Sequence, residues 1–499
     1  MRARLMAPDR DFDPGGDPPA HATDLIQDLE LETVLAAMAA GDRYLWDVAR
    51  AALVRGPESG SAAVIHRQDV LKDSLANAGV VRALYGLAAD TVERERRLFW
   101  AFNSRQASTI LYGAVEQLDM LRDALKRLRD LADQHGHAFS SQGFTALFRT
   151  LKRELDDEYL ALLRNHLARL RFRSGVLLGA GLGDGNQGTD YSLLRTTGAS
   201  RTWLQRLLRK VPVGLTFAIA ERDEAGARAL SALRDRGLNL VANAAAQSAE
   251  HLLGFFRLLR AELAFYVGCL NLHDALSRVG APTTFPVPGP PDARALRFTE
   301  LYDVALALTT GRRPVGNTLD AGGARLVVIT GANQGGKSTF LRSLGLAQLM
   351  MQAGMFVGAE SFVGALSTGL FTHYRREEDP SMQQGKLDEE LGRMSAIAED
   401  VRADAVILFS ESFAATNDRE GSEIARQVVA ALLARRVRVL MVTHLFEFAQ
   451  RLAPRAEGDT IFLRAERLED GTRTFRMIPG APLETSFAED VYREVFGDD

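Results

Sequence analysis

The hydrophobic residues in the early part of the chain recur every three or four positions, which is the period of an amphipathic helix. Four segments have this pattern, namely residues 25–41, 80–102, 109–134 and 144–172. Polar and charged residues of both signs occupy the remaining positions, as on a solvated helix face. Residues 24–172 are therefore predicted to be helical. The last segment is predicted to be one long helix of an elongated bundle or lever.

The pattern changes after Ser174, where short apolar runs flank a glycine-rich turn at residues 183–188. This arrangement predicts a β-hairpin, with residues 213–221 as a further strand of the same small sheet. The glycines also suggest a second nucleotide loop, but no Gly-Lys-Ser/Thr follows them. The helical period returns over 222–281, which is long enough to pair antiparallel with the earlier lever.

Two stretches rich in proline interrupt the periodic pattern. Residues 1–23 combine Pro, Asp and Gly, a composition typical of a disordered tail. Residues 283–293 contain four prolines and predict a linker, which we extend to 295. The chain is thus divided into a tail (1–23), a helical region with a small β element (24–282), a linker (283–295) and a second major domain (296–499).

The second domain contains a complete phosphate-binding motif. An apolar run at 327–329 leads into residues 331–338, GANQGGKS, which match G-x-x-x-x-G-K-[ST] at every required position. The glycines permit close approach of backbone N–H groups to phosphate oxygens, and the following helix directs its positive end there. Lys337 would contact the terminal phosphates, and Ser338 would offer a hydroxyl to Mg²⁺. A plain glycine turn between a strand and a helix is the alternative.

Two further apolar strands each end in a residue that suits phosphate chemistry. Residues 405–409 lead into Ser410 and Glu411, and residues 437–443 lead into His444. A carboxylate past a buried parallel strand can orient and activate a water, and a histidine there can donate to the γ-phosphate or to the water. The alternative for each is an ordinary polar residue at a strand end. Their order after the phosphate loop favours catalysis.

Composition and charge limit the class of protein. Hydrophobic residues make up 46% of the chain and charged residues 25%, as in ordinary globular proteins. The single cysteine, Cys269, excludes an internal disulfide framework and a cysteine-built zinc site. No apolar stretch is long enough to span a bilayer, and no secretory signal opens the chain, so a cytoplasmic protein without membrane contact is expected.

The net charge of −4 means that any nucleic-acid contact must come from a local basic patch. The best candidate is the acid-free segment 195–210. Its basic residues are Arg195, Arg201, Arg206, Arg209 and Lys210. They would contact a DNA phosphate backbone. The alternative is an amphipathic helix that packs Trp203 inward and leaves these charges solvated.

Together these motifs resemble the ATPase domain of the MutS family, the mismatch-repair ATPases of the ABC superclass. Residues 330–339, TGANQGGKST, are close to the family's usual TGPNMGGKST. The segments 312–319, 411–425 and 441–449 resemble the stretch before the loop, the Walker B and D-loop stretch and the switch-histidine segment. The resemblance is strong over the last 200 or so residues and weaker over the core and lever region.

The resemblance implies a multidomain α and α/β protein, with an ABC-type P-loop ATPase domain after the helical region. It implies ATP and Mg²⁺ as cofactors, with Glu411, His444 and Lys337 in catalysis and Ser338 on Mg²⁺, Ser410 being a second candidate through a water. The implied nucleotide contacts are Gly331, Asn333, Gly335, Gly336, Lys337, Ser338, Thr339, Val315 and Asn317. It also implies a homodimer on DNA, associated with the nucleoid, in mismatch repair or recombination-related processing.

Three departures from the family pattern change these expectations. Ser410 stands where the family has Asp, and Leu387 stands where it has a serine that reaches the partner subunit's nucleotide. Slow hydrolysis is therefore expected, while nucleotide binding should survive.

The helical core begins by about residue 24, so the resemblance predicts no N-terminal mismatch-recognition domain. The alternatives are a DNA clamp that uses ATP with little turnover, and a nucleotide-gated interaction platform that never touches DNA.

Overall fold

The computed structural model describes residues 1–55, 60–99, 106–173, 175–194, 218–220, 222–376, 385–452 and 459–482. Residue contacts divide the chain into two compact units. The first unit contains residues 1–3, 83–137 and 146–260, and the second contains 4–82, 138–145 and 261–499. The predicted division at the proline-rich stretch is thus wrong for the early helices, which fold with the second unit. Periodicity identifies a helix but not the partner against which it packs.

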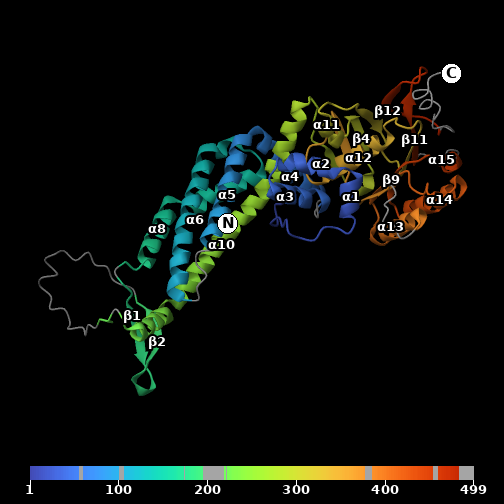
Figure 1. Cartoon of the computed structure of the whole chain (residues 1–499). Helices are drawn as coiled ribbons and strands as arrows, with labels where there is room; N and C mark the ends of the chain where they lie inside the picture. The colour runs from blue at the N-terminus through green and yellow to red at the C-terminus, as the bar shows by residue number, and fades with distance from the viewer. Residues whose placement is uncertain are drawn as a thin grey trace. The chain divides into compact units, whose positions relative to one another are not determined.

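The first unit is a helical bundle, as the three- and four-residue spacing predicts (Figure 1). Its helices are most of α5 (Ala78–Phe99), α6 (Ala107–His135), most of α7 (Gln142–Glu154), α8 (Asp157–Leu170) and the first part of α10 (Glu224–Arg278). Polar contacts join neighbouring helices: Gln117 of α6 donates to Glu95 of α5 at 3.2 Å, and Glu95 also pairs with Arg257 of α10 at 3.8 Å. The 3-10 turn η1 (Gly136–Ala138) follows α6.

The segment predicted as one long helix over 144–172 is two helices, which corrects that prediction. The Asp156 carboxylate accepts a hydrogen bond of 2.7 Å from the Tyr159 N–H and caps α8. Aspartate at a helix start satisfies backbone donors that have no intrahelical partner. Mixed charges on the polar face hide such a cap, because the apolar spacing continues through it.

The glycine-rich turn forms the predicted hairpin. Strands β1 (Leu178–Leu182) and β2 (Gly188–Leu193) pair antiparallel around the 3-10 turn η2 (Asp184–Asn186). Gly185 has φ of 67°, a backbone region that glycine adopts without steric cost. The strand predicted over 213–221 lies mostly outside the described residues.

The second unit begins with a packed N-terminal segment, which contradicts the predicted disordered tail. Leu5 and Met6 are fully buried, and their N–H groups donate to the buried Glu262 carboxylate at 2.5 and 3.3 Å. Tyr266 donates to the Leu5 carbonyl at 2.6 Å. A Pro- and Asp-rich composition gives no sign of these long-range partners, which lie more than 250 residues away. Four short helices follow, namely α1 (Ala22–Asp28), α2 (Leu31–Ala39), α3 (Arg43–Arg55) and α4 (Gly60–Ala76).

A six-stranded sheet forms the centre of the second unit. Its order is β12-β11-β6-β10-β9-β8, and all neighbours are parallel except the β11–β12 pair. The strands are β6 (Leu326–Thr330), β8 (Leu370–Tyr374), β9 (Val406–Ser410), β10 (Arg438–Val442), β11 (Thr460–Arg467) and β12 (Arg473–Pro479). The apolar runs predicted as buried strands are β6, β9 and β10, whose residues are almost all buried.

A four-stranded sheet, in the order β3-β7-β4-β5, accompanies the larger one. Its strands are β3 (Val287–Gly289), β4 (Leu296–Leu301), β5 (Asn317–Asp320) and β7 (Ser361–Ala365). Because β3 pairs with β7, the predicted linker is part of the folded unit, which corrects that boundary. Proline is tolerated in β3 because this strand lies at the sheet edge. The 3-10 turn η3 (Pro291–Ala293) also falls in this stretch.

Further helices complete the second unit, and several of them pack on the larger sheet. They are α11 (Val304–Thr310), α12 (Lys337–Gln352), α13 (Lys386–Asp400), α14 (Asp418–Ala434) and α15 (Phe446–Leu452). Helix α12 is buried along most of its length, and Gly345 lets it approach Leu408 of β9. A core of buried side chains from β9, β10, α13 and α14 supports the strand ends. The carboxyl ends of β6, β8, β9 and β10 therefore meet at one firmly held edge.

Candidate functional site

The loop between β6 and α12 contains the glycine motif, in the strand–loop–helix order that the sequence predicts. Gly331 has φ of 111° and Gly336 has φ of 85°, values that side chains strongly disfavour. A Cβ at Gly331 would lie 3.0 Å from the Ala465 backbone nitrogen. Lys337 is 5% exposed and donates to the Gly331 and Ala332 carbonyls at 2.9 and 2.8 Å. Burial lowers the pKa of Lys337, which the nearby Glu411 charge partly opposes.

Glu411 and His444 meet at the same sheet edge. Because β9 and β10 are parallel neighbours, the residues that follow them emerge together, and His444 Nε2 lies 3.0 Å from Glu411 Oε1. Their side chains are about one-third exposed, at 32% and 33%. The hydrogen bond from His444 lowers the pKa of Glu411 despite partial burial. An ionised carboxylate only accepts hydrogen bonds, so Nε2 of His444 carries the proton and donates.

A cavity of about 390 Å³ adjoins the glycine loop. The predicted residues that line it are Val315, Asn317, Asn333, Gly335, Gly336, Lys337, Ser338, Thr339 and Glu411. Gly331 and His444 do not line it, and each is joined to it by a hydrogen bond to a lining residue. The structure therefore brings the predicted loop, carboxylate and histidine to one place.

Val315 and Asn317 are placed differently within this cavity. Val315 is 42% exposed and offers an apolar surface. Asn317 is buried, and its amide joins two strands: Oδ1 accepts from Met477 N–H at 2.7 Å and Nδ2 donates to the Phe475 carbonyl at 3.4 Å. The Asn317 side chain therefore holds β5 against β12. Phe475, 48% exposed with φ of 61°, also lines the cavity.

Ser338 and Ser410 bring two hydroxyls together at the predicted metal position. Their Oγ atoms lie 3.3 Å apart. Both groups are neutral, and the adjacent carboxylate of Glu411 is bonded to His444. Within the described part of the chain, no group of three or more His, Cys, Asp or Glu side chains is arranged to hold a metal ion. The protein thus supplies weak oxygen donors here and no carboxylate dedicated to a cation.

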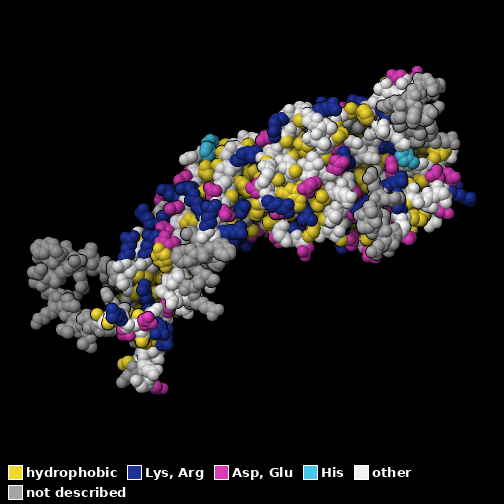
Figure 2. Space-filling view, in the orientation of Figure 1, with side chains coloured by type: hydrophobic (Ala, Val, Ile, Leu, Met, Phe, Trp, Pro, Cys, Tyr) yellow, Lys and Arg dark blue, Asp and Glu magenta, His cyan; other side chains and the backbone are white. Residues whose placement is uncertain are grey.

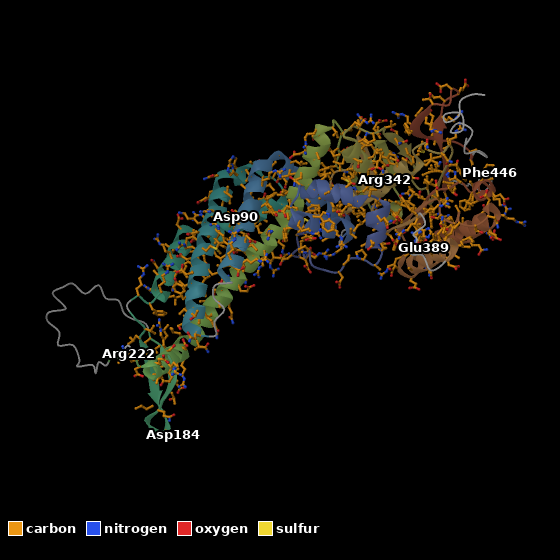
Figure 3. The ribbon with its side chains drawn as sticks, viewed as in Figure 1. Asp90, Asp184, Arg222, Arg342, Glu389 and Phe446 are labelled. Carbon is orange, nitrogen blue, oxygen red and sulfur yellow. The ribbon has the colours of Figure 1, made fainter. Side chains whose placement is uncertain are left out.

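An ion-pair network fixes helix α12 beside the cavity. Arg342 of α12 pairs with Asp303 and with Glu30, and the Asp303 carboxylate also caps α11 by accepting from the Leu306 N–H at 3.0 Å. Figure 3 labels Arg342 within the second unit. Burial raises the pKa of Asp303, and the Arg342 charge opposes this shift. Asp303 lines the cavity and is 2% exposed. The network connects α12, the helix after the glycine loop, to the segment before β5.

A buried polar network lies directly behind Glu411. His373 of β8 contacts the Ser412 hydroxyl at 2.8 Å through Nδ1 and the Glu390 carbonyl at 2.9 Å through Nε2. The Glu390 carboxylate accepts from the Phe413 N–H at 3.0 Å. Burial lowers the pKa of His373 to about 4, so its ring is neutral near pH 7. Because Glu411 and Phe413 have positive φ of 55° and 64°, this network holds a strained turn in place.

Other predicted residues lie elsewhere or outside the described residues. Leu387 is on the first turn of α13, and its neighbour Lys386 lines a second cavity beside Ser410 and Glu411. The segment 195–210, which contains the predicted DNA contacts, falls outside the described residues. Phe475, Asp303 and Arg342 were not predicted as site residues. They come from distant segments, and only the resemblance around residues 312–319 indicated this neighbourhood.

The fold and site define a mixed α and α/β protein with a glycine-loop cavity at the carboxyl ends of parallel strands. Two family models match the chain. They are the MutS2 N-terminal domain over residues 59–279 and MutS domain V over residues 327–491. The chain belongs to the MutS family, and the resemblance inferred from its motifs is confirmed.

Curated relatives match the chain over a limited length. The DNA mismatch repair protein MutS of Thermus aquaticus is 33% identical over 168 residues, covering 33% of this chain and 20% of that protein. Endonuclease MutS2 of Thermus thermophilus is 28% identical over 158 residues, covering 32% and 21%. MutS of Thermotoga petrophila is 31% identical over 144 residues, covering 28% and 18%. The chain thus matches about a fifth of the length of these relatives. None of the helices that the structure describes combines the length and the apolar character of a membrane span.

Proposed function

We propose that this protein binds ATP in the cavity beside the glycine loop and hydrolyses it slowly, as an ABC-type P-loop ATPase that acts on DNA. The observation that carries the proposal is the convergence of the loop, Lys337 and the Glu411–His444 pair on one cavity of about 390 Å³. The loop's backbone N–H groups and the N-terminus of α12 would hold the phosphates. Val315 and Phe475 would contact the base from the cavity wall.

Glu411 and His444 would act on the attacking water. The ionised carboxylate accepts a hydrogen bond from the water and aligns it with the γ-phosphate. A carboxylate whose pKa is lowered is a weak base, so Glu411 orients the water more than it removes a proton. The imidazole N–H of His444, which donates to Glu411 in this structure, would turn during hydrolysis to the negative charge that develops on the γ-phosphate oxygens. Slow turnover is consistent with this arrangement.

Mg²⁺ fits this site as a companion of the nucleotide. Magnesium favours six oxygen ligands and is often bound by substrate phosphates and few protein groups. Ser338 would supply a hydroxyl ligand, and Ser410 would contact the ion's water shell. Bound Mg²⁺ would neutralise phosphate charge during hydrolysis.

The DNA assignment is supported by family membership and by exposed cations on the first unit. Figure 2 shows Lys and Arg side chains gathered over this helical unit. Exposed examples are Arg94 and Arg96 of α5, Lys126 and Arg127 of α6, and Arg149 of α7. Such charges would bind DNA phosphates in a salt-dependent way, with residues 195–210 as a further contribution. We place the protein in the cytoplasm with the nucleoid, as a homodimer whose ATP-bound state closes on DNA in mismatch repair or recombination-related processing.

Phosphate release tests the ATPase proposal. Wild type is expected to release phosphate from ATP at a slow, saturable rate, and Glu411→Gln is expected to lower the rate by at least about 100-fold while retaining ATP binding. The conservative change keeps the hydrogen bond to His444 available. Equal phosphate release by the two proteins would contradict the role of Glu411.

Band-shift titrations test the DNA proposal. Duplex, branched and mismatched DNA would be titrated at several salt concentrations, with and without ATP. The affinity is expected to fall steeply with salt because phosphate contacts release counterions. A missing salt-dependent shift on all three DNAs would remove the DNA assignment and favour a nucleotide-gated interaction platform.

A second function is favoured by Ser410, which replaces a charged metal-binding group with a hydroxyl. In this alternative, the protein is a DNA clamp that uses ATP as a conformational ligand with little turnover. Measurable ATP binding without phosphate release by wild type or Glu411→Gln would favour the clamp.

A further inference from the structure

A second cavity adjoins the proposed nucleotide cavity on the far side of the phosphate loop's serine. Its volume is about 970 Å³, and Ser338 and Glu411 line both cavities. Ser410, Arg375 and Arg376 also line the second cavity. A terminal phosphate held between Ser338 and Glu411 would therefore face this space.

Sheet topology places Arg375 at this position. Tyr374, the last residue of β8, is in register with Ser410, the last residue of β9. The Arg375 N–H then donates to the Ser410 carbonyl at 2.8 Å. Arg375 and Glu411 are thus the first residues past two parallel neighbouring strands. The Arg375 charge also helps to lower the pKa of Glu411, after the larger effect of His444.

The two arginines of the second cavity differ in their partners. Arg376 pairs with Asp24 of α1, and both side chains are 27% exposed. Arg375 is exposed, and among the residues that the structure describes, no hydrogen bond or ion pair engages its guanidinium. With respect to the described residues, the guanidinium of Arg375 is therefore open to a ligand, whereas Arg376 has a structural partner.

The two cavities lack the free carboxylates that usually surround a tightly bound metal ion, as far as the described residues show. The hydroxyls of Ser338 and Ser410 are neutral, and Glu411 is engaged by His444. A guanidinium binds phosphate oxygens through planar, charge-assisted hydrogen bonds and cannot lose its proton. The permanent positive charge of Arg375 beside the neutral hydroxyls of Ser338 and Ser410 therefore favours a polyphosphate anion over a metal ion.

We propose that Arg375 contacts the terminal phosphate of the bound nucleoside triphosphate and supplies, within the same chain, part of the charge neutralisation that Mg²⁺ otherwise provides. This rests on the proposed ATP site. Ser410 and Arg375 act together. The neutral hydroxyl of Ser410 binds Mg²⁺ more weakly than a carboxylate would, and the guanidinium of Arg375 supplies positive charge to the terminal phosphate. ATP binding therefore depends weakly on Mg²⁺.

Equilibrium binding of ATP and ADP, in MgCl₂ and in EDTA, tests the proposal by calorimetry on the full chain. Wild type is expected to bind ATP in EDTA within about tenfold of its affinity in MgCl₂. Arg375→Ala is expected to lose about tenfold or more of its ATP affinity in EDTA and less in MgCl₂ or with ADP, because one charge-assisted contact to the terminal phosphate is removed. Arg375→Lys is expected to fall between them, since it retains the charge and loses the planar fork.

Two matched variants separate this role from a general structural effect. Arg376→Ala, next along the chain, is expected to leave the ratio of ATP affinities in MgCl₂ and EDTA unchanged. Ser410→Asp is expected to increase the dependence on Mg²⁺, because it adds a carboxylate for the metal and repels bare phosphate. Unchanged circular dichroism would show that each variant folds.

The possible failures are distinct. If wild type binds no ATP even in MgCl₂, the nucleotide site itself is wrong. If wild type binds ATP in MgCl₂ but loses more than about tenfold in EDTA, or if Arg375→Ala matches wild type in EDTA, the role of Arg375 is overturned while the nucleotide site stands.

Discussion

Glu262 holds the N-terminal segment against α10, and its titration makes this packing depend on pH. The fully buried carboxylate accepts hydrogen bonds from the N–H groups of Leu5, Met6 and Phe12 at 2.5, 3.3 and 3.3 Å. Burial raises its pKa from 4.5 to about 7, with a smaller contribution from the Asp11 charge, and the three hydrogen bonds oppose this rise. The folded state therefore binds the proton more tightly than a state in which the segment has detached.

The sign and size of the effect follow from proton linkage. A raised folded-state pKa contributes stability that is complete below the ordinary pKa of 4.5 and is lost as the pH rises through about 7. Between pH 5.5 and pH 8, the segment should lose about 2 kcal/mol of packing stability, which is roughly 30-fold in its opening equilibrium. Above pH 8 no further loss is expected from this group.

Amide hydrogen exchange of the Leu5, Met6 and Phe12 N–H groups measures this opening directly. Protection factors, corrected for the intrinsic effect of pH on exchange, should fall by roughly 30-fold between pH 5.5 and pH 8. Glu262→Gln cannot ionise, so its protection factors should be nearly independent of pH. Equal pH dependence in the wild type and in Glu262→Gln would refute the reasoning.

Two further predictions concern the support of the proposed nucleotide site. Gly331→Ala would place a side chain at a backbone φ of 111°, with its Cβ 3.0 Å from the Ala465 nitrogen. The variant should therefore lose about 1–3 kcal/mol of unfolding free energy, measured in urea, and it should bind ATP more weakly. A variant with unchanged stability and affinity would show that the loop tolerates the strain. Glu390→Ala removes the acceptor of the Phe413 N–H and should slow phosphate release by about tenfold with little change in ATP affinity. Glu389→Ala, on the same turn of α13, is the control, and equal slowing in both would contradict a specific role for Glu390.

Local patterns predict the elements around the candidate site where one segment contains the whole signal. The motif at 331–338 and the apolar runs before Glu411 and His444 correctly indicate the strands β6, β9 and β10 and the helix α12. The parallel pairing of β9 and β10 then brings Glu411 and His444 together, because residues that follow neighbouring parallel strands emerge at the same edge of the sheet. Family membership follows from the same residues.

Features that depend on partners distant in sequence escape such patterns. Glu262 lies within an apolar helix and gives no sign that it receives the N–H groups of residues 5–12. The same missing information makes the N-terminal segment resemble a disordered tail. Arg375 resembles one more charge in a polar loop until β8 is paired with β9. The break before α8 is hidden because the hydrophobic spacing continues through its cap.

The central claim is that the cavity beside the glycine loop binds ATP, and equilibrium binding to the wild type and to Lys337→Ala tests it most directly. Lys337 is the first residue of α12, and its ammonium donates to the Gly331 and Ala332 carbonyls of the loop, where the proposal places a phosphate. The wild type should bind ATP saturably with one site per chain, and Lys337→Ala should lose at least about 100-fold in affinity while remaining folded. ATP binding of equal strength in both proteins, or no binding by the wild type, would contradict the account.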